Sequence, residues 1–259
     1  MVLWCAYCQK VLGEKEPFEN HSITHGICPK CRAEKAVFNG QLIDRSLAIK
    51  KFLEDVLSLI NLKKPFYHKE FIDKCLKLGL GPKEIIFFII QPFMIKIGED
   101  WAIGELEVAE EHAYSVEVEK VLNYLLEMCD SSMESHQPVD ALVMPASLSE
   151  HFFGCKVVSI MLQLEGLRVI NFFNGATFKM VKEAIDTYAP KAIVVSCTLE
   201  VHVNEVFKLD TQLTKENYHI PLFVGGQGFS NKVEPLSHHI QIIKNFDDLI
   251  QKIHPKVAS

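Results

Sequence analysis

Hydrophobic positions recur at two different spacings along the chain, and the change separates a helical part from a mixed part. Between residues 41 and 130 the spacing is three or four, as in the run Leu42, Ile43, Leu47, Phe52, Leu53, Val56, Leu57 and Ile60. This pattern predicts amphipathic helices over about 42–60, 66–78, 82–98 and 106–129. Pro82 suits a first helical turn, whereas Pro92 should kink or break the third helix. Four helices with short connections favour an antiparallel bundle.

From Pro138 onward, short β-rich runs alternate with segments of helical length. Strands are expected at 141–144, 168–172, 192–196 and 222–224, and helices at about 152–165, 177–188, 200–214 and 246–253. Such alternation predicts right-handed crossovers and a parallel sheet of flavodoxin-like, Rossmann type. Ligands of such sheets bind beyond the carboxyl ends of the strands.

Residues 1–39 follow neither pattern and contain little apolar periodicity, so this segment needs a cross-link such as a bound metal to fold. The predicted fold class is therefore α/β with three parts. These are a four-cysteine, zinc-ribbon-like module over 1–39, a four-helix bundle cap over 40–131, and a Rossmann-like domain over 137–257.

Composition narrows the classes of function. Hydrophobic residues make up 48% of the 259 positions and charged residues 23%, as in globular proteins with a large core. The formal net charge of −6 disfavours non-specific binding to nucleic acid. No apolar run approaches 18 residues and the N-terminus lacks a secretory pattern, so we expect a cytoplasmic protein without a membrane span.

Four of the eight cysteines form two Cys-x-x-Cys pairs, Cys5/Cys8 and Cys28/Cys31, separated by 19 residues. In a reducing compartment this spacing predicts a structural zinc site with four thiolates and no open position. An iron site with the same ligands and an unmetallated set of thiols are the alternatives. His21 and His25 lie between the pairs and are substitute ligands in principle.

The remaining cysteines, Cys75, Cys129, Cys155 and Cys197, show no pairing pattern and are expected to be buried thiols. The charged residues of the 1–39 module give a net charge of only +1. Because that is a weak electrostatic footprint for DNA binding, contact with a protein partner or dimerisation is at least as well supported.

Small and polar residues follow the first, third and fourth expected strands. They are Ser149-x-His151-x-x-Gly154, Ser196-x-Thr198 and Gly225-Gly226. In kind, order and placement these motifs resemble the cobalamin-binding domain of methionine synthase and its relatives, over about residues 139–257.

This resemblance implies that His151 is the lower axial ligand of cobalt and that the cofactor's nucleotide tail enters the crevice of the sheet. Gly154, Gly225 and Gly226 would admit the tail, and Ser196 and Thr198 would hydrogen-bond it. The family's aspartate, which orients the histidine, is Ser149 here, and a serine hydroxyl would orient the ring more weakly.

The stretch from Ile97 to His112 contains Trp101 and the pair Glu111-His112. By itself it describes a helix hairpin with a core tryptophan and an acidic face. Its spacing, ahead of the motifs above, resembles the cap of light-responsive, adenosylcobalamin-dependent transcriptional regulators. The resemblance implies that Trp101 and Glu111 cover the adenosyl group on the upper face of cobalt, with His112 as a helper.

Two departures limit this second resemblance. The histidine that follows the tryptophan in the best-studied regulators is Ala102 here. The family's DNA-binding helix-turn-helix is replaced by the cysteine module, so DNA binding does not carry over.

The leading hypothesis is a cobalamin-binding sensor, responsive to light through adenosylcobalamin, that signals through changed contacts with a protein partner or a second copy. The alternative is a corrinoid carrier of methyl groups within a methyltransferase system, and a third is a scaffold that no longer binds cofactor. Because the chain has no nucleophile motif and no Gly-x-Gly-x-x-Gly fingerprint, we do not expect a hydrolytic or hydride-transfer enzyme.

Overall fold

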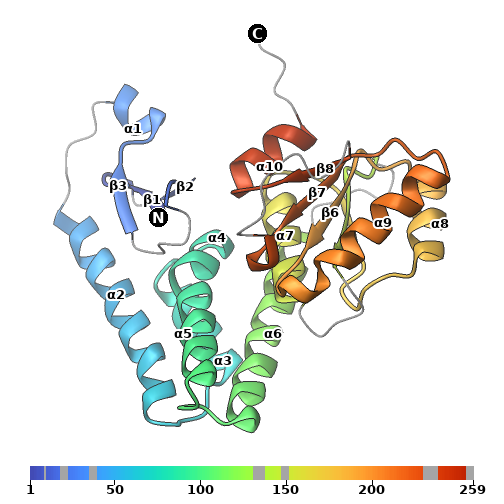
Figure 1. Cartoon of the computed structure of the whole chain (residues 1–259). Helices are drawn as coiled ribbons and strands as arrows, with labels where there is room; N and C mark the ends of the chain where they lie inside the picture. Colours follow the sequence, from blue (N-terminus) through green and yellow to red (C-terminus); the bar gives the residue numbers. More distant parts are fainter. Residues whose placement is uncertain are drawn as a thin grey trace. The chain divides into compact units, whose positions relative to one another are not determined.

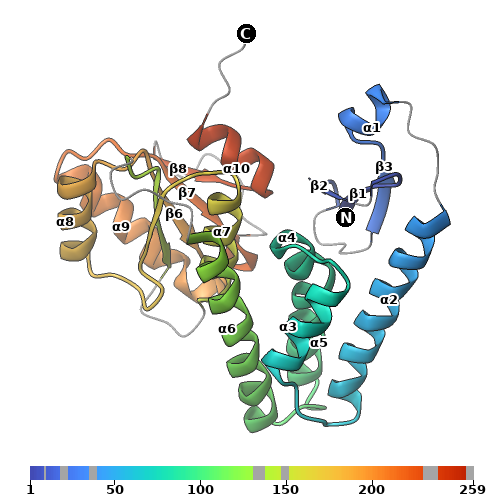
Figure 2. The same cartoon turned by 180° about the vertical axis from the view of Figure 1, so that it is seen from behind.

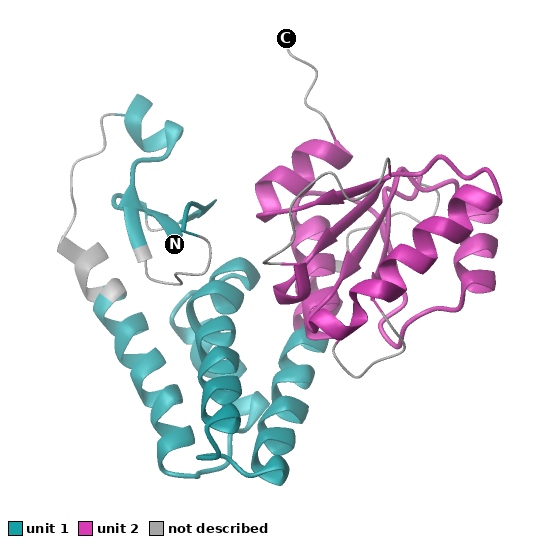
Figure 3. Ribbon diagram, viewed as in Figure 1, with its two compact units in different colours: residues 1–124 teal, residues 125–259 magenta. Residues whose placement is uncertain are grey.

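The computed structural model describes residues 1–8, 10–17, 23–34, 40–130, 138–146, 152–229 and 239–254. The chain divides into two compact units, Met1–Tyr124 and Leu125–Ser259 (Figure 3). The cysteine segment and the helical segment both belong to the first unit. The predicted boundaries at 39/40 and 131/137 stay a prediction.

The first unit opens with a small three-stranded sheet and a short helix (Figure 1). Strand β1 (Val2–Cys5) pairs antiparallel with β2 (Val11–Glu14) and parallel with β3 (Ile23–Gly26), which gives the order β2-β1-β3. Helix α1 (Pro29–Ala33) follows, and Cys28 is its N-cap. The two cysteine pairs therefore lie where β1 ends and where α1 begins.

The helical segment contains four helical stretches, as the apolar spacing predicts; each is called a rod below because one of them is composed of several elements. They are α2 (Gly40–Asn61), α3 (His68–Lys77), a composite rod of α4 (Pro82–Ile85), η1 (Ile86–Ile90) and α5 (Gln91–Ala102), and α6 (Val108–Asp130). Figure 2 shows α3 beside α5 from behind. Aromatic rings hold the rods together: the Phe66 and Phe93 ring centroids are 5.0 Å apart, and those of Phe93 and Tyr114 are 5.7 Å apart.

The third rod continues through Pro92 because a π-helical turn precedes it. Within an α-helix, a proline at position 92 would clash with the carbonyl of Phe88 and remove one hydrogen bond. The turn η1 inserts an extra residue, and the Gln91 N–H donates to the Ile86 carbonyl five residues back. All five residues of η1 are buried. The expected kink is therefore a widened turn, a feature that is frequent at functional sites.

The second unit is built on a five-stranded, fully parallel sheet in the order β5-β4-β6-β7-β8. The strands are β4 (Ala141–Pro145), β5 (Val169–Asn171), β6 (Ala192–Ser196), β7 (Leu222–Gly225) and β8 (Ile240–Ile242). The helices are α7 (Phe153–Leu164), α8 (Phe178–Tyr188), α9 (Val203–Lys215) and α10 (Phe246–Ile253), with short 3-10 turns η2 (Glu200–His202) and η3 (Gln227–Phe229). This is the flavodoxin-like order 2-1-3-4-5, in which the chain switches direction between β4 and β6.

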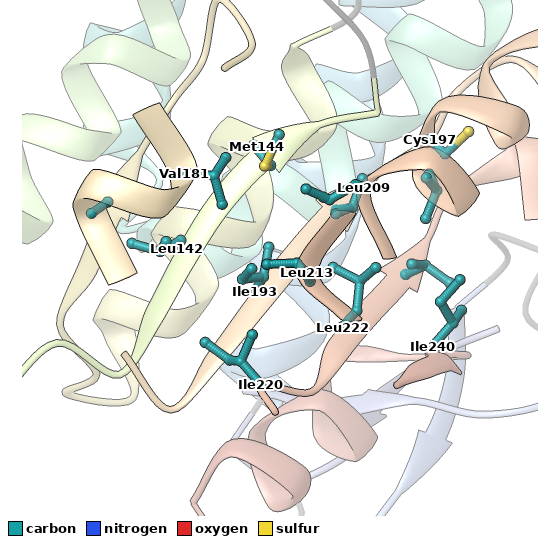
Figure 4. Packing of buried hydrophobic residues seen from close by; sticks show 14 of the residues in the cluster. Leu142, Met144, Val181, Ile193, Cys197, Leu209, Leu213, Ile220, Leu222 and Ile240 are labelled. Carbon is teal, nitrogen blue, oxygen red and sulfur yellow. The ribbon is translucent and has the colours of Figure 1, made fainter. Parts of the chain in front are cut away.

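Alternate residues of each central strand face opposite sides of the sheet, and both sides are covered by helices. Leu142 and Ile193 face α8 and α9, in the apolar cluster drawn in Figure 4. Ala141 and Val194 face α7 and α10. Burial on both faces explains why these strands read as continuous apolar runs in the sequence.

These observations confirm the predicted fold class, a mixed α/β chain with a parallel sheet, a helical segment and a cysteine module. The edge strand β8 was not predicted, because Ile240–Ile242 is three residues long and is defined only by its pairing with β7. Among the described helices, none combines the length and apolar character needed to cross a membrane.

Candidate functional site

The four predicted metal ligands come together in the first unit. The Sγ atoms of Cys5, Cys8, Cys28 and Cys31 all lie within 4.8 Å of one another. The Sγ atoms of Cys8 and Cys28 are 3.8 Å apart. A tetrahedral shell with zinc–sulfur bonds of about 2.3 Å places its sulfur atoms about 3.8 Å apart. The cluster therefore has dimensions that fit a metal ion.

Backbone N–H groups around the cluster favour the thiolate form of Cys5. The Cys31 N–H donates to the Cys28 sulfur over 3.3 Å, and the Cys28 N–H donates to the Cys5 sulfur over 3.4 Å. Although burial opposes ionisation, backbone N–H groups, first that of Cys8, lower the pKa of Cys5 to about 6. A hydrogen bond with Cys28, followed by burial, raises the pKa of Cys31 to about 12. A metal cation would stabilise all four as thiolates.

The neighbouring histidines do not join this cluster among the described residues. The His25 ring stacks against Trp4, with centroids 6.2 Å apart, and His25 is not one of the four clustered ligands. His21 lies outside the described residues. Cys75, Cys129, Cys155 and Cys197 are buried and lie outside this cluster, as expected.

In the second unit, Gly154 and Ser196 meet at the point where the strand order reverses. Gly154 lies in the first turn of α7, and Ser196 is the last residue of β6. A Cβ atom on Gly154 would overlap the Ser196 hydroxyl oxygen. The space that a side chain at position 154 would need is therefore occupied by the Ser196 hydroxyl. The absence of that side chain lets α7 approach the carboxyl end of β6.

Gly226 serves a similar purpose beside β7. Its φ of +102° is rarely adopted by residues with a side chain, and a Cβ there would overlap the Cys197 carbonyl. The Cys197 N–H donates to the Gly225 carbonyl over 2.8 Å, and the Gly228 N–H donates to the Cys197 carbonyl over 2.9 Å. Gly225 itself leaves more room, since its nearest contact would be the Ile243 carbonyl at 3.5 Å. Thus the carboxyl ends of β6 and β7 form one hydrogen-bonded edge.

Two predicted site residues, Ser149 and His151, lie outside the described residues. Next to them in sequence, Lys156 is a residue that the pattern did not single out. It is only 4% exposed, and its Nζ lies 4.8 Å from the Phe152 ring centroid and 5.5 Å from that of Phe173. The sequence signal that could have identified Lys156 is its place within the apolar run of α7, because buried lysines are rare unless they are paired.

Trp101 lies in the last turn of α5, just before a tightly held connection to α6. The Asp100 carbonyl accepts the N–H groups of Glu105 over 2.8 Å and Leu106 over 3.2 Å. The Asp100 carboxylate pairs with Lys96 Nζ at 2.5 Å. Trp101 is nevertheless 53% exposed, so its ring is not a core residue of its unit. This outcome argues against the interpretation of the stretch as a hairpin with a core tryptophan.

Glu111 and His112 are in contact at the start of α6. The Ser115 hydroxyl donates to Glu111 Oε1 over 2.6 Å, and His112 Nδ1 lies 2.6 Å from Glu111 Oε2. The Glu111 carboxylate is thus fixed from both sides. His112 is more exposed than Glu111, with 64% against 25% of the side chain accessible.

One protein-family model, described as "B12 binding domain", matches residues 67–126. That range contains α3 to most of α6, including Trp101, Glu111 and His112. No curated protein gives a significant match to the chain. The helical segment is thus similar to a B12-binding domain over this range.

Several solved structures are similar to the chain. A monomethylamine corrinoid protein from Methanosarcina barkeri aligns with a TM-score of 0.63 and 17% identity, covering 78% of this chain and 97% of that one. A methanol:cobalamin methyltransferase complex from the same organism aligns with a TM-score of 0.38 and 11% identity over 89% and 90%. A cobalamin-binding protein from Desulfitobacterium hafniense DCB-2 aligns with 0.32 and 15% over 81% and 88%. The first likeness establishes a shared fold of bundle and parallel sheet.

Proposed function

We propose that this chain binds cobalamin, with the second unit as the receptor for the lower part of the cofactor. The observation that carries the proposal is the edge where β4, β6 and β7 end. The half-buried hydroxyls of Ser196 and Thr198 lie there, beside Gly225 and Gly226. Such a switch point is where parallel sheets bind ligands. The match of residues 67–126 to a B12-binding domain supports the same ligand.

His151 is the proposed ligand of the cobalt, with Ser149 as the group that orients its ring. Both residues belong to the segment between β4 and α7, and Gly154 fixes the start of α7 against Ser196. A neutral imidazole is a suitable ligand for a transition metal.

Trp101, Glu111 and His112 are the proposed contacts to the upper ligand. Trp101 offers an exposed flat ring at the end of α5, next to a hydrogen-bonded connection, which is the property that a cover for an adenosyl group requires. Glu111, held by Ser115 and His112, offers carboxylate oxygens in a set orientation for ribose or adenine. These features favour adenosylcobalamin and a regulatory role, with a protein partner or a second copy reading the change.

When bound, cobalamin supplies a cobalt–carbon bond, which light cleaves in the adenosyl form and a methyltransferase exchanges in the methyl form. The first test is the absorption spectrum of the protein loaded with adenosylcobalamin in the dark and after green light. We expect a base-off, histidine-ligated spectrum that changes irreversibly on illumination, together with a change in assembly. A bound cofactor with no response to light would remove the light-sensing role.

A methyl-carrier function is the second candidate. It is favoured by the fold shared with the monomethylamine corrinoid protein, which the alignment covers over 97% of its length. Its test is methyl transfer from methylcobalamin-loaded protein to a thiol acceptor in the presence of a methyltransferase. Transfer without a light response would select this function over the sensor.

We further propose that Cys5, Cys8, Cys28 and Cys31 hold structural zinc. The 3.8 Å sulfur separation and the absence of an open position in a four-thiolate shell support this choice. Elemental analysis of the purified protein should give one zinc per chain. Cys8→Ser should lower that ratio, whereas Cys75→Ala, at a thiol outside the cluster, should not.

A further inference from the structure

Strand β1 contributes one residue to the cysteine cluster and the residue before it to a contact with the helical segment. Trp4 and Cys5 are consecutive residues of this strand, so their side chains point to opposite faces of the small sheet. Cys5 is fully buried and lies in the cysteine cluster. Trp4 is only 2% exposed, and its ring centroid lies 4.9 Å from that of Phe88.

Phe88 is the central residue of the π-helical turn η1. It is 2% exposed, as is Phe87 beside it. This turn lies within residues 67–126, the range that matches the B12-binding domain. The indole ring of Trp4 therefore packs on the irregular turn of the segment assigned to cofactor binding.

The position of Trp4 depends on packing and on the strand that carries it. Within the described part of the chain, its indole N–H is buried without a hydrogen-bond partner. The His25 ring of β3 also stacks with the indole ring, and Trp4 and His25 are paired in the β1–β3 ladder. The next pair in that ladder is Cys5 with Gly26, two residues before Cys28. The strands that position Trp4 thus lead directly into the cysteine cluster.

We infer that metal binding by the four cysteines controls the order of the π-helical turn through Trp4. A structural metal contributes its binding free energy to the folding of its module. A small sheet with so few apolar residues would lose its fixed strands without the metal. Trp4 would then leave Phe88, and the turn that contains Phe88 would open more often. This inference rests on the proposed zinc site but not on the bound cofactor.

The test uses the full chain without cobalamin. The sequence has two tryptophans, so Trp101→Phe leaves Trp4 as the single emitter. With zinc present, we expect blue-shifted emission from the buried indole, and after removal of zinc by a chelator a shift to longer wavelength. Amide hydrogen exchange across 86–90 should increase by roughly tenfold or more on removal and return on addition of zinc. Exchange across β4, in the other unit, should stay unchanged.

Trp4→Ala should keep one zinc per chain but show fast exchange across 86–90 with or without the metal. If that variant does not fold, Phe88→Leu gives the same comparison from the helical side. Trp4→Phe should restore slow, zinc-dependent exchange. A chain that binds no zinc would overturn both the zinc site and the inference. Zinc binding with no effect on Trp4 emission or on 86–90 would overturn the inference alone.

Discussion

Gly154 leaves the space that the hydroxyl group of Ser196 occupies, and this contact joins the first turn of α7 to the carboxyl end of β6. Burial raises the pKa of the adjacent Cys155 thiol to about 12, against hydrogen bonds with Ser196 that lower it. The glycine that the sequence motif assigned to ligand approach therefore has a packing role within the protein.

Gly154→Ala should destabilise the second unit by about 1–3 kcal/mol, the usual cost of overpacking, and should weaken retention of cobalamin. The double variant Gly154→Ala/Ser196→Ala should recover much of that stability, because the overlapping oxygen is gone. Urea unfolding of the four members of this cycle measures the coupling. Gly98→Ala is the control, since a Cβ there meets no atom within 4 Å. Independent, additive effects of the two substitutions would contradict the proposed contact.

Trp101→Ala should leave folding stability within about 0.5 kcal/mol, because the ring is half exposed. It should selectively reduce affinity for adenosylcobalamin relative to hydroxocobalamin, which lacks the adenosyl group. Dissociation constants for the two cofactors check this. Ile103→Ala is the matched control at an exposed apolar residue two positions further on, just after the end of α5. Equal loss for both cofactors would argue against contact with the upper ligand.

Glu117 should make the helical unit sensitive to acid. Burial opposes its ionisation, but the His68 N–H, Lys120 and the His68 ring lower its pKa from 4.5 to about 2. A lowered pKa stabilises the fold above pH 4.5, and this contribution is lost as pH falls toward 2.

The stability difference between the native chain and Glu117→Gln should be about 1–3 kcal/mol at pH 7 and should shrink by pH 3. Urea midpoints followed by helical circular dichroism at both values measure it. Glu127→Gln, on the exposed side of the same helix, should show no such trend. A difference that is constant with pH would show that the carboxylate charge does not contribute.

Tyr114→Phe should lower stability by about 1–2 kcal/mol, because two backbone carbonyls lose their hydrogen-bond donor. The Tyr114 hydroxyl donates to the Leu59 carbonyl over 3.1 Å and to the Lys64 carbonyl over 2.9 Å, which ties α6 to the end of α2. The exposed Tyr188 provides the control substitution to phenylalanine. Equal unfolding midpoints for the two variants would contradict this role of the hydroxyl.

The sequence by itself determined the fold class, the separation of a helical segment from a mixed α/β segment, and the four cysteines that cluster. Local rules were sufficient for these features. Apolar spacing of three or four predicts a helix such as α6 whatever surrounds it, and a continuous apolar run predicts a buried strand such as Ala192–Ser196. The spacing of two Cys-x-x-Cys pairs likewise predicts that the four cysteines come together, as they do.

Only the tertiary structure decided which residues distant in the sequence are in contact. The strand order that brings Ser196 against Gly154, the edge strand β8 and the packing of Trp4 against Phe88 depend on contacts between segments far apart in the chain. The sequence contains each of these residues, but no local pattern encodes the partner. Pro92 shows the difference most clearly, because its effect on the backbone was predictable, whereas the π-helical turn that accommodates it was selected by packing.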